Sequence, residues 1–558
     1  MLTGFDWLAL GPALIVGVAG VVLLLGDAFA GVRSWMLGTV GSLVALGGAA
    51  VAAAGLTGGT RETMCTQLTG RAALQEPEHC SFVVDDVTIA LWWIILVGAA
   101  LVVVMAAAHA DDAAMPPGEF HFLLLSSVGG ALTLAAARDL VTLVVALELV
   151  SLPSIALVAL RRGDPLGARS AWTFFLASVT ATAVTLMGVS LVYGTTGSVF
   201  FDGVRDGVQA GVGPESALRT GVVLTLAGLV FKIGAVPFHM WVPDTYAGAP
   251  VPVAAYLSVV SKAAGIAGVV LLVGWPFAPV ISTWGPLVAV IAGVTMTLGN
   301  LAALRQTDAV GLLAWSSVAQ AGFVVAPLVA VFAGAPGSAD DGLQAAIRYL
   351  GIYALANLAA FAVVTHVRAR TGRTDLAAFR GLARSDRLAG ATLLMALLTL
   401  AGFPPAIIGL MAKYVALRPV IVDGAGFLAV VMAVNVMIGL AYYLRFAAIA
   451  VAPAEVAAPA GVATAAAGSA TAPGPGAGEE GATAPDAEGE TSTATGPAPG
   501  TEDAASTGTG TAPGPEVAAS TARGSTFGES WLRAAFALTL AALVATSLWP
   551  DLVFRLLI

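Results

Sequence analysis

The chain is divided almost from end to end into apolar runs of the length that crosses a lipid bilayer. About 20 apolar residues in a helix span the hydrocarbon core, and about fourteen such runs lie between residues 8 and 557. Hydrophobic residues make up 58% of the chain and charged residues 11%, whereas soluble domains carry roughly 25% charged residues. The sequence therefore predicts an all-α polytopic membrane protein with about fourteen transmembrane helices.

The apolar runs fall into groups, and one polar segment separates the last run from the others. That segment is rich in Ala, Gly, Pro, Thr and Ser and carries several carboxylates, so it cannot bury a core and is predicted to be a disordered acidic linker. The predicted parts are helices one to three in 1–108, a five-helix block in 120–274, a second in 277–450, the linker in 452–525 and a C-terminal helix in 526–558. Two five-helix blocks have opposite orientations because five is odd, which is typical of inverted-repeat transporters.

The distribution of arginine orients the predicted helices. If the N-terminus lies outside the cytoplasm, fourteen arginines fall inside and eight outside, which is the asymmetry that membrane proteins show. Both termini are then predicted to be outside, and residues 1–26 are interpreted as a helix because no basic region precedes them. This topology places Cys65 and Cys80 in an oxidising compartment, where either a disulfide or two thiols are possible. Together with His79 they form only a partial ligand set, so no metal site is predicted.

Only three lysines occur among the 25 cationic residues, and each lies within or against an apolar run: Lys232, Lys262 and Lys413. Lysine is ordinarily a surface residue, and an ammonium at membrane depth costs about 2.5–3.5 kcal/mol on insertion scales. Lys232 could still snorkel to a nearby surface, but Lys262 lies too far inside its run. Ser261, next to Lys262, could hold water or simply bond a preceding carbonyl. The lysines indicate a proton or ion path.

Prolines interrupt two of the runs that carry these lysines. Pro237 follows Lys232 by five residues, and Pro404-Pro405 precede Lys413 within the run 389–417. Proline removes a backbone donor and breaks a helix, and the freed carbonyls of a broken membrane helix can bind water or ions. His239, just past the first break, is either a proton relay near the entrance or an interfacial residue.

Glu148 is the carboxylate that lies nearest the middle of a predicted span. It is either a polar anchor between helices or a partner for a lysine. A carboxylate stabilises a buried ammonium that desolvation disfavours, so separation of Glu148 from Lys232 would pass the proton onward. The sequence contains no four-cysteine cluster and no phosphate-binding glycine loop ahead of a soluble helix, and we predict no nucleic-acid partner.

Three motifs carry a resemblance to a known family. They are LELVSLPSIALVAL around Glu148, FKIGAVPFHMWVPDTYAGAPVPVAAYLSVVSKAAG around Lys232 and Lys262, and GNLAALRQTDAVGLLAWSSVAQAGF from Gly299. Over roughly residues 85–450 the chain resembles the antiporter-like subunits of respiratory complex I, the proton-translocating NADH:quinone oxidoreductase, and is most similar to subunit N. The resemblance implies fourteen helices with two inverted five-helix repeats, and protonatable positions at Glu148 and the three lysines.

The chain departs from the family pattern at two places. Gln320 stands where the family often has histidine, so this position can hold water but cannot take up a proton. The segment from Pro405 to Lys413 is one residue longer than usual, so Lys413 could point differently. A lysine in the twelfth helix is typical of N or L rather than M, and L continues beyond fourteen helices.

The resemblance implies a proton-translocating subunit in the bacterial cytoplasmic membrane. NADH, flavin, iron–sulfur clusters and quinone would be bound by other subunits of the complex, with no cofactor on this chain. Its partners would be other membrane subunits, including antiporter-like ones, and the bilayer. Two alternatives stay open: a subunit of a multi-subunit cation/proton antiporter or membrane-bound hydrogenase, and a non-pumping scaffold.

Overall fold

The computed structural model describes residues 5–30, 35–66, 79–110, 112–333, 338–422, 424–453 and 526–550, so the predicted linker lies almost wholly outside the described residues. The described part is mostly helical and includes one two-stranded sheet. In chain order the elements are α1 (Trp7–Ala30), α2 (Trp35–Ala54), β1 (Arg61–Cys65), β2 (Cys80–Val84), α3 (Asp86–Ala106), η2 (Ala107–His109), α4 (Pro117–Ala136), α5 (Leu140–Val158), α6 (Pro165–Thr196), α7 (Phe201–Gln209), α8 (Glu215–Ile233), α9 (Trp241–Gly248), α10 (Val251–Tyr256), η3 (Leu257–Ser261), α11 (Lys262–Gly274), η4 (Ala278–Val280), α12 (Ile281–Leu304), α13 (Ala309–Val325), η5 (Ala326–Ala333), α14 (Ser338–Thr371), η6 (Leu376–Phe379), α15 (Leu382–Ser385), α16 (Arg387–Ala401), α17 (Ile407–Val422), α18 (Gly426–Val451) and α19 (Thr526–Leu548).

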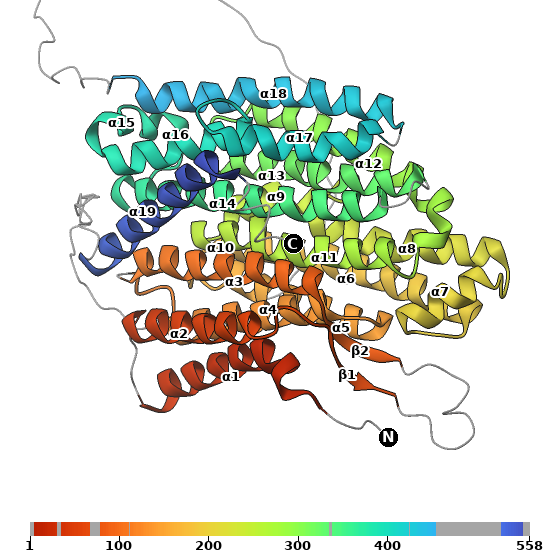
Figure 1. Cartoon of the computed structure of the whole chain (residues 1–558). Helices are drawn as coiled ribbons and strands as arrows, with labels where there is room; N and C mark the ends of the chain where they lie inside the picture. The colour runs from red at the N-terminus through yellow and green to blue at the C-terminus, as the bar shows by residue number, and fades with distance from the viewer. Residues whose placement is uncertain are drawn as a thin grey trace, which may run out of the picture. The chain divides into compact units, whose positions relative to one another are not determined.

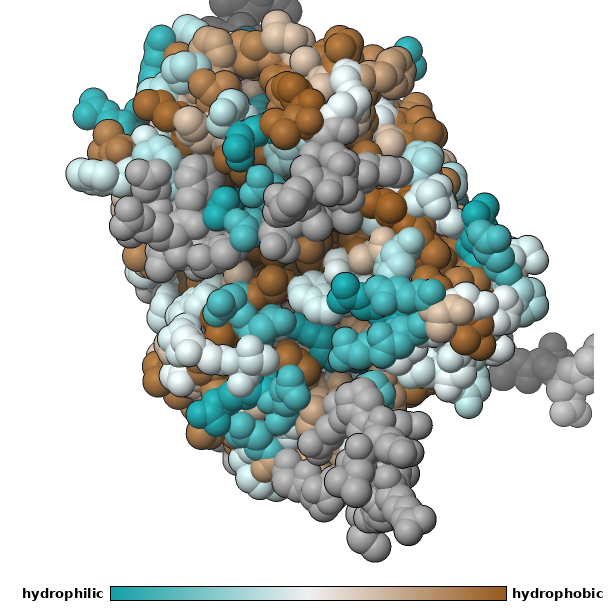
Figure 2. Space-filling view, turned by 45° about the vertical axis from the view of Figure 1, so that its right-hand side comes forward, coloured by the Kyte–Doolittle hydropathy of each residue, from teal (hydrophilic) through white to brown (hydrophobic). Residues whose placement is uncertain are grey.

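The helices form a bundle of membrane-spanning segments (Figure 1). Within the described residues, 13 helices are long and apolar enough to cross a membrane, and the shorter α16 and α17 divide the predicted run 389–417. The prediction of an all-α polytopic protein is therefore confirmed. The spans Val251–Gly274 and Ala309–Val329 are each 94% buried, whereas Trp7–Phe29 is 22% buried. The two spans that are 94% buried therefore form the centre of the bundle. Helix α1 lies at the edge of the bundle, where apolar side chains are exposed. Figure 2 shows hydrophobic residues over much of one face, with hydrophilic residues gathered in a band across its middle.

A capping aspartate explains how α4 and α5 are separated by almost no loop. Asp139 is the N-cap of α5, and its Oδ1 accepts hydrogen bonds from the backbone N–H groups of Val141 and Thr142. These are donors that the first turn of a helix leaves unsatisfied. The preceding Arg138 forms an ion pair of 2.6 Å with Asp85, which caps α3. The charged pair that interrupts the apolar sequence therefore fixes the ends of two helices.

Two helices break where the sequence has proline. The first, α8, ends at Ile233 and is followed by Gly234 in the left-handed conformation (φ 70°), a common helix C-terminal arrangement. Pro237 lies between α8 and α9. In the second, Gly402 (φ 72°) ends α16, and Pro404-Pro405 separate it from α17. Proline has no N–H to continue a helical ladder, which accounts for both interruptions.

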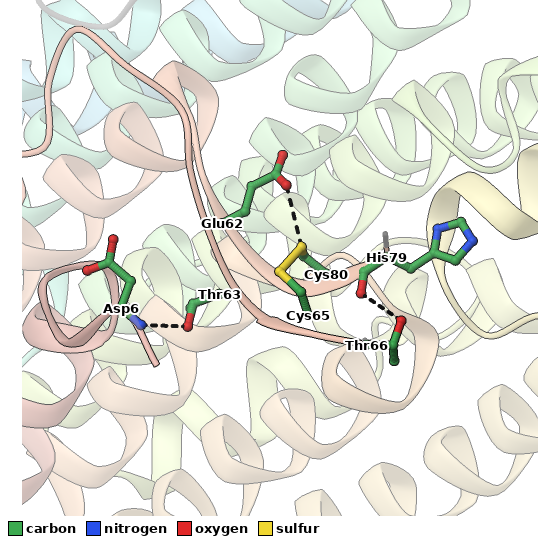
Figure 3. Close-up of a disulfide and its surroundings, with 7 residues drawn as sticks. All are labelled: Asp6, Glu62, Thr63, Cys65, Thr66, His79 and Cys80. Atoms are coloured by element: carbon green, nitrogen blue, oxygen red, sulfur yellow. Dashed lines mark hydrogen bonds between the residues drawn. A yellow bond between two sulfur atoms is a disulfide. The ribbon is translucent and has the colours of Figure 1, made fainter. Parts of the chain in front are cut away.

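The two cysteines close a hairpin at one end of the bundle (Figure 3). Strands β1 and β2 are antiparallel, and their register places Cys65 opposite Cys80, where the two form a disulfide. This resolves the alternatives that the sequence left open. The hairpin is tied to the start of α1, because the backbone N–H of Asp6 donates to Thr63 Oγ1 at 3.0 Å and Arg61 pairs with the Asp6 carboxylate at 3.0 Å.

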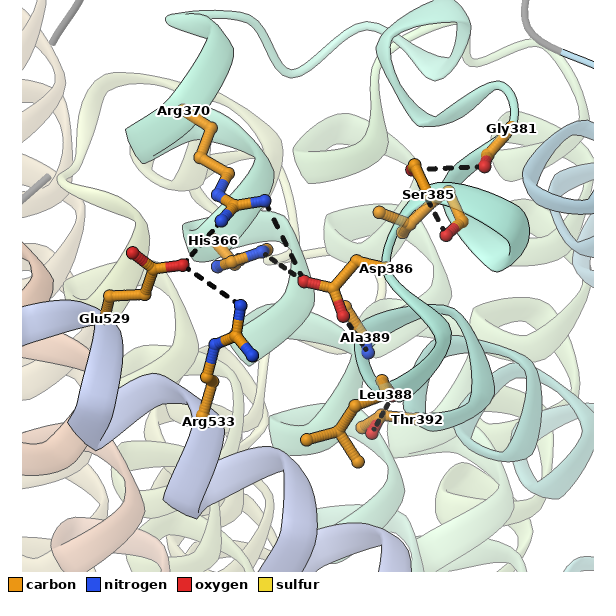
Figure 4. A network of polar contacts seen from close by, with 11 residues as sticks. His366, Arg370, Gly381, Ser385, Asp386, Leu388, Ala389, Thr392, Glu529 and Arg533 are labelled. Atoms are coloured by element: carbon orange, nitrogen blue, oxygen red, sulfur yellow. Dashed lines mark hydrogen bonds and ion pairs between the residues drawn. The ribbon is translucent and has the colours of Figure 1, made fainter. Parts of the chain in front are cut away.

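A charged cluster joins α19 to the rest of the bundle (Figure 4). Glu529 of α19 accepts hydrogen bonds from Arg370 of α14 at 2.5 Å and from Arg533 of its own helix at 3.3 Å. Beside them, Asp386 caps α16 and lies 3.2 Å from Nε2 of the buried His366. The helix that follows the linker in the sequence is therefore held against α14 and α16.

The connecting segments gather at two ends of the bundle. At one end β2 pairs with the α4–α5 junction, and Asp139 pairs with Phe200 just before α7. At the other end Asp308, the N-cap of α13, pairs with Asp375 beside η6. Figure 1 shows α7 and the hairpin on one side and α15 on the other. This grouping agrees with the alternation of spans that the apolar runs predict.

Candidate functional site

All three lysines are buried within the bundle. The exposed fraction is 1% for Lys232 on α8, 1% for Lys262 at the start of α11 and 8% for Lys413 on α17. These side chains therefore do not snorkel to the surface. Glu148, in the middle of α5, is half-buried. Burying a charge is costly unless hydrogen bonds or an opposite charge stabilise it, so the neighbours of each lysine decide what it can do.

A serine lies between the positions of Glu148 and Lys232. Lys232 Nζ donates to Ser151 Oγ at 2.9 Å and lies 5.7 Å above the ring of Phe174. Ser151 is almost one helical turn beyond Glu148 and donates its own hydroxyl to a carbonyl oxygen of α5 at 2.8 Å. Glu148 accepts a hydrogen bond from the hydroxyl of Thr182 on α6. The predicted coupling residues thus lie near each other, but each has a hydroxyl partner and they form no direct ion pair in the described structure.

Lys262 is held by the backbone and side chain of one residue of α13. Its Nζ donates to the carbonyl oxygen of Ser317 at 2.5 Å and contacts Ser317 Oγ at 3.1 Å. The turn just before it, η3, is a π-helix, a rare form that often occurs at functional sites. Ser261, at the end of that turn, is buried, and its hydroxyl has no hydrogen-bond partner among the described residues. A water molecule would satisfy it.

The π-helical turn is also fixed from α14. Asn357 Nδ2 donates to Ser258 Oγ at 2.8 Å, and Tyr353 donates its hydroxyl to the Ser258 carbonyl oxygen at 3.0 Å. An extra residue in a helical turn leaves backbone carbonyls without their usual partners. The α14 side chains therefore stabilise the irregular backbone just ahead of Lys262.

Gln320 lies in a hydrogen-bonded group that joins three helices. Its Oε1 accepts from the hydroxyl of Tyr349 on α14 at 2.6 Å, and its Nε2 donates to Tyr443 on α18 at 3.1 Å. Ser316 shares a hydrogen bond of 2.5 Å with the same Tyr443. Since Ser316 neighbours Ser317, this polar group begins beside the partner of Lys262.

Lys413 lies on α17, and its side chain packs against the break between α16 and α17. Its Nζ lies 5.3 Å from the ring centre of Phe323, within the range of a cation–π contact. A Cβ added to Gly402 would lie 2.7 Å from Lys413 Cδ, so the glycine at the break leaves room for the lysine stem. Gln320 and Tyr349 line a small cavity beside α17. Lys413 therefore points into the bundle despite the longer segment that precedes it.

His239 follows Pro237 in the first break. It is 8% exposed, its Nδ1 has no hydrogen-bond partner in the described part of the chain, and its ring lies 5.6 Å from that of Trp315. His239 is therefore buried against α13 and does not lie on an open surface. Its role, as a proton relay or as an interfacial residue, stays a prediction.

Several polar residues of this region gave no signal in the sequence. Ser and Thr are common in membrane helices because they bond their own preceding carbonyls, so Ser151, Thr182 and Ser317 do not stand out. Asn357 could have been noticed, since an amide inside an apolar run needs a partner. The tyrosines were overlooked because a phenol can be either interfacial or buried.

Comparisons with known proteins identify the family to which the chain belongs. Residues 137–439 match the family described as NADH:quinone oxidoreductase/Mrp antiporter, TM. The chain is 44% identical over 459 residues to NADH-quinone oxidoreductase subunit N 2 of Streptomyces griseus subsp. griseus, covering 81% of this chain and 84% of that one. It is 40% identical over 456 residues to subunit N of Salinispora tropica, covering 80% and 86%.

Solved structures of membrane complexes contain chains of similar fold. A chain of respiratory complex I from Thermus thermophilus superposes with a TM-score of 0.67 at 26% identity, covering 98% of both chains. A chain of the Mrp complex from Dietzia sp. gives 0.68 at 22% identity over 80% of each, a likeness of fold alone. The chain belongs to the antiporter-like membrane proteins of the NADH:quinone oxidoreductase/Mrp family. Within them, it belongs with subunit N of the NADH-quinone oxidoreductases.

Proposed function

We propose that this chain moves protons across the bacterial cytoplasmic membrane as subunit N of an NADH:quinone oxidoreductase. The relatives named subunit N support the assignment to this complex. The observation that carries proton transfer is the burial of the chain's three lysines inside the helix bundle, each beside a hydroxyl or aromatic partner. Ionisable residues inside a membrane are rare and mark ion or proton paths.

The redox groups of such a complex would lie in other subunits. Iron–sulfur clusters are held mainly by cysteine thiolates, and this chain has two cysteines, which are joined in a disulfide. These residues do not fit a cluster. NADH, flavin and quinone would likewise be bound by partner subunits, and other antiporter-like subunits would be neighbours in the membrane.

Proton transfer would begin at Glu148 and Lys232. The Ser151 hydroxyl accepts from Lys232 and donates to its own helix, so it can hold the ammonium without a carboxylate. A change that brought Glu148 and Lys232 into contact would favour the charged lysine, and their separation would favour release of its proton. In the described arrangement they are separate, with Thr182 holding Glu148.

Lys262 would be the next station and Lys413 the last one towards the outer side. Lys262 is held by Ser317, and the group of Ser316, Tyr443 and Gln320 continues from there. An amide cannot take up a proton at neutral pH, so Gln320 would act by orienting water and hydroxyl groups between stations. The cavity that Gln320 lines beside α17 is the expected place for such water.

The membrane arrangement is part of the same proposal. Two five-helix repeats, in 120–274 and 277–450, would be inverted relative to each other, and each contains a proline-broken helix with a lysine beside it: Lys232 in the first and Lys413 in the second. The hairpin end of the bundle would face outward, which suits its disulfide. Both chain termini would also face outward, as the arginine distribution indicates.

Purification of the chain with its partners tests the assignment. We expect that affinity-tagged chain, extracted in mild detergent from membranes of its own host, will bring with it NADH-dependent quinone reduction. Untagged host membranes carried through the same column are the matched control. Recovery of an assembly that exchanges cations for protons but does not oxidise NADH would instead favour the antiporter alternative, which the fold likeness to the Mrp chain keeps open.

A further inference from the structure

A second polar site lies away from the lysines, where the ends of α1, α2 and α4 meet. A cavity of about 270 Å³ is lined there by Asp27, Trp35, Asp112, Glu119 and Arg162, and we call it the α1–α4 pocket. Asp27 also lines a smaller space that reaches His121 on α4. The site lies at the ends of membrane spans, since one span ends at Phe29 and two others begin at Trp35 and Pro117. Lipid headgroups occupy this depth of a bilayer.

The pocket and the smaller space beside it contain two buried polar atoms that the described residues leave without a partner. One oxygen of Glu119 is 3.9 Å from Arg162, but its other oxygen, Oε2, is buried without a hydrogen-bond partner. His121 is 0% exposed, and its Nδ1 is bonded to Ser42 Oγ at 2.9 Å, while Nε2 has no partner. Asp27 has no ion pair in the described part of the chain. Buried polar atoms are normally satisfied, so Glu119 Oε2 and His121 Nε2 point to a polar ligand, and the carboxylate oxygen requires one with N–H or O–H donors.

Two glycines shape the pocket around these side chains. A Cβ at Gly118 would lie 2.5 Å from Asp27 Cβ, and a Cβ at Gly38 would lie 2.2 Å from His121 Cδ2. No other residue type could stand at either place without displacing the acid or the imidazole. The space between the helices is thus occupied by ionisable side chains rather than by the apolar packing of the rest of the bundle.

The charges of the pocket select a ligand with a cationic head and an anionic group beside it. Asp112 is already paired with Arg161 at 3.0 Å, which leaves Asp27 and Glu119 as carboxylates for a cation. Arg162 lies at the rim with a side chain 68% exposed, where it can meet an anion. Large apolar side chains that neighbour Asp27 and Trp35 in the sequence are exposed, namely Leu25, Phe29, Met36 and Leu37. They form a surface for acyl chains.

We propose that the α1–α4 pocket binds the primary ammonium headgroup of a phospholipid, as in phosphatidylethanolamine. The ammonium N–H groups would donate to Asp27 and Glu119, and the phosphate would meet Arg162. Phosphatidylcholine has the same charges but no N–H donor, so it cannot satisfy the unused acceptors. A bound headgroup would join α1 and α2 to α4 at the membrane surface.

Native mass spectrometry of the intact complex tests this proposal. The delipidated complex is incubated with phosphatidylethanolamine or phosphatidylcholine of matched acyl chains, and lipid adducts are counted on this chain when it is released. We expect phosphatidylethanolamine to be retained about tenfold better than phosphatidylcholine, as the loss of a charge-assisted hydrogen bond predicts. Equal retention of the two lipids by the unmodified chain would overturn the proposal without any variant.

Variants then locate the site. Asp27→Asn and Glu119→Gln should each remove most of the preference, whereas Asp202→Asn, at an exposed acid of α7 away from the pocket, should preserve it. An unchanged preference in both pocket variants would place the lipid elsewhere and refute the site. Loss of a partner subunit from the Glu119→Gln complex, with no change in the lipids bound, would show that a protein cation fills the pocket and would also refute it.

Discussion

Replacement of Ser151 by alanine tests the part assigned to the hydroxyl between Glu148 and Lys232. Ser151 Oγ is the hydrogen-bond acceptor of the Lys232 ammonium, at 2.9 Å, and the lysine is 1% exposed, so water does not replace the lost group freely. A hydrogen bond to a charged group contributes about 1.5–3 kcal/mol. Since 1.4 kcal/mol corresponds to a factor of ten, the charged state of Lys232 should become about ten to a hundred times less populated relative to the neutral one.

The expected result is a matching loss of coupled turnover, of about tenfold or more, if proton occupancy of Lys232 limits the cycle. Proton uptake and NADH-driven quinone reduction are measured together in inverted membrane vesicles, with complex assembly checked by gel. Ser151→Thr keeps the hydroxyl and should retain activity. Ser154→Ala is the second control, because Ser154 donates to the Ser151 carbonyl and does not contact the lysine. Normal pumping in an assembled Ser151→Ala complex would refute the reasoning.

Two further predictions concern the hairpin and the second helix break. Cys65→Ser opens a disulfide between residues separated by 15 positions, and the loss of about 3 kcal/mol should speed protease cleavage of the hairpin in intact membranes while pumping stays normal. Cleavage at the wild-type rate would contradict this prediction, because it would show that the other contacts of the hairpin protect it without the disulfide. Gly402→Ala and Gly424→Ala both place alanine at positive φ, but a Cβ contacts Lys413 only at Gly402. Vesicle assays should therefore show a pumping loss in Gly402→Ala alone, and equal losses in both variants would contradict a specific effect on Lys413.

The sequence predicted the fold well because membrane helices leave a strong signal. Every backbone polar group must be satisfied inside lipid, so apolar runs form helices, and Pro237 and Pro404-Pro405 lie at the two breaks that the sequence predicted. The junction of α4 and α5 needs no longer loop, because Asp139 caps α5 directly. The disulfide could not be decided from the sequence, because it depends on the register of β1 against β2.

The charged residues of the candidate site were visible in the sequence, but their partners were not. Lysine is conspicuous in an apolar run because its burial is costly, whereas Ser317 resembles many serines that only bond their own helix. The π-helical turn before Lys262 is stabilised by hydrogen bonds from Tyr353 and Asn357, which lie 95 and 99 positions from Ser258 in the chain. Long-range contacts of this kind leave no periodic pattern in the sequence.

Proton translocation through the buried lysines is tested most directly at Lys262, which lies in a span that is 94% buried. Lys262→Met keeps a long apolar side chain and removes the ammonium that Ser317 holds. The measurement is proton pumping against NADH-driven quinone reduction in inverted vesicles that contain the assembled mutant complex. The account predicts that pumping is lost, alone or together with coupled oxidation. Normal pumping and normal oxidation in the assembled mutant would contradict it and would favour a scaffold role for the chain.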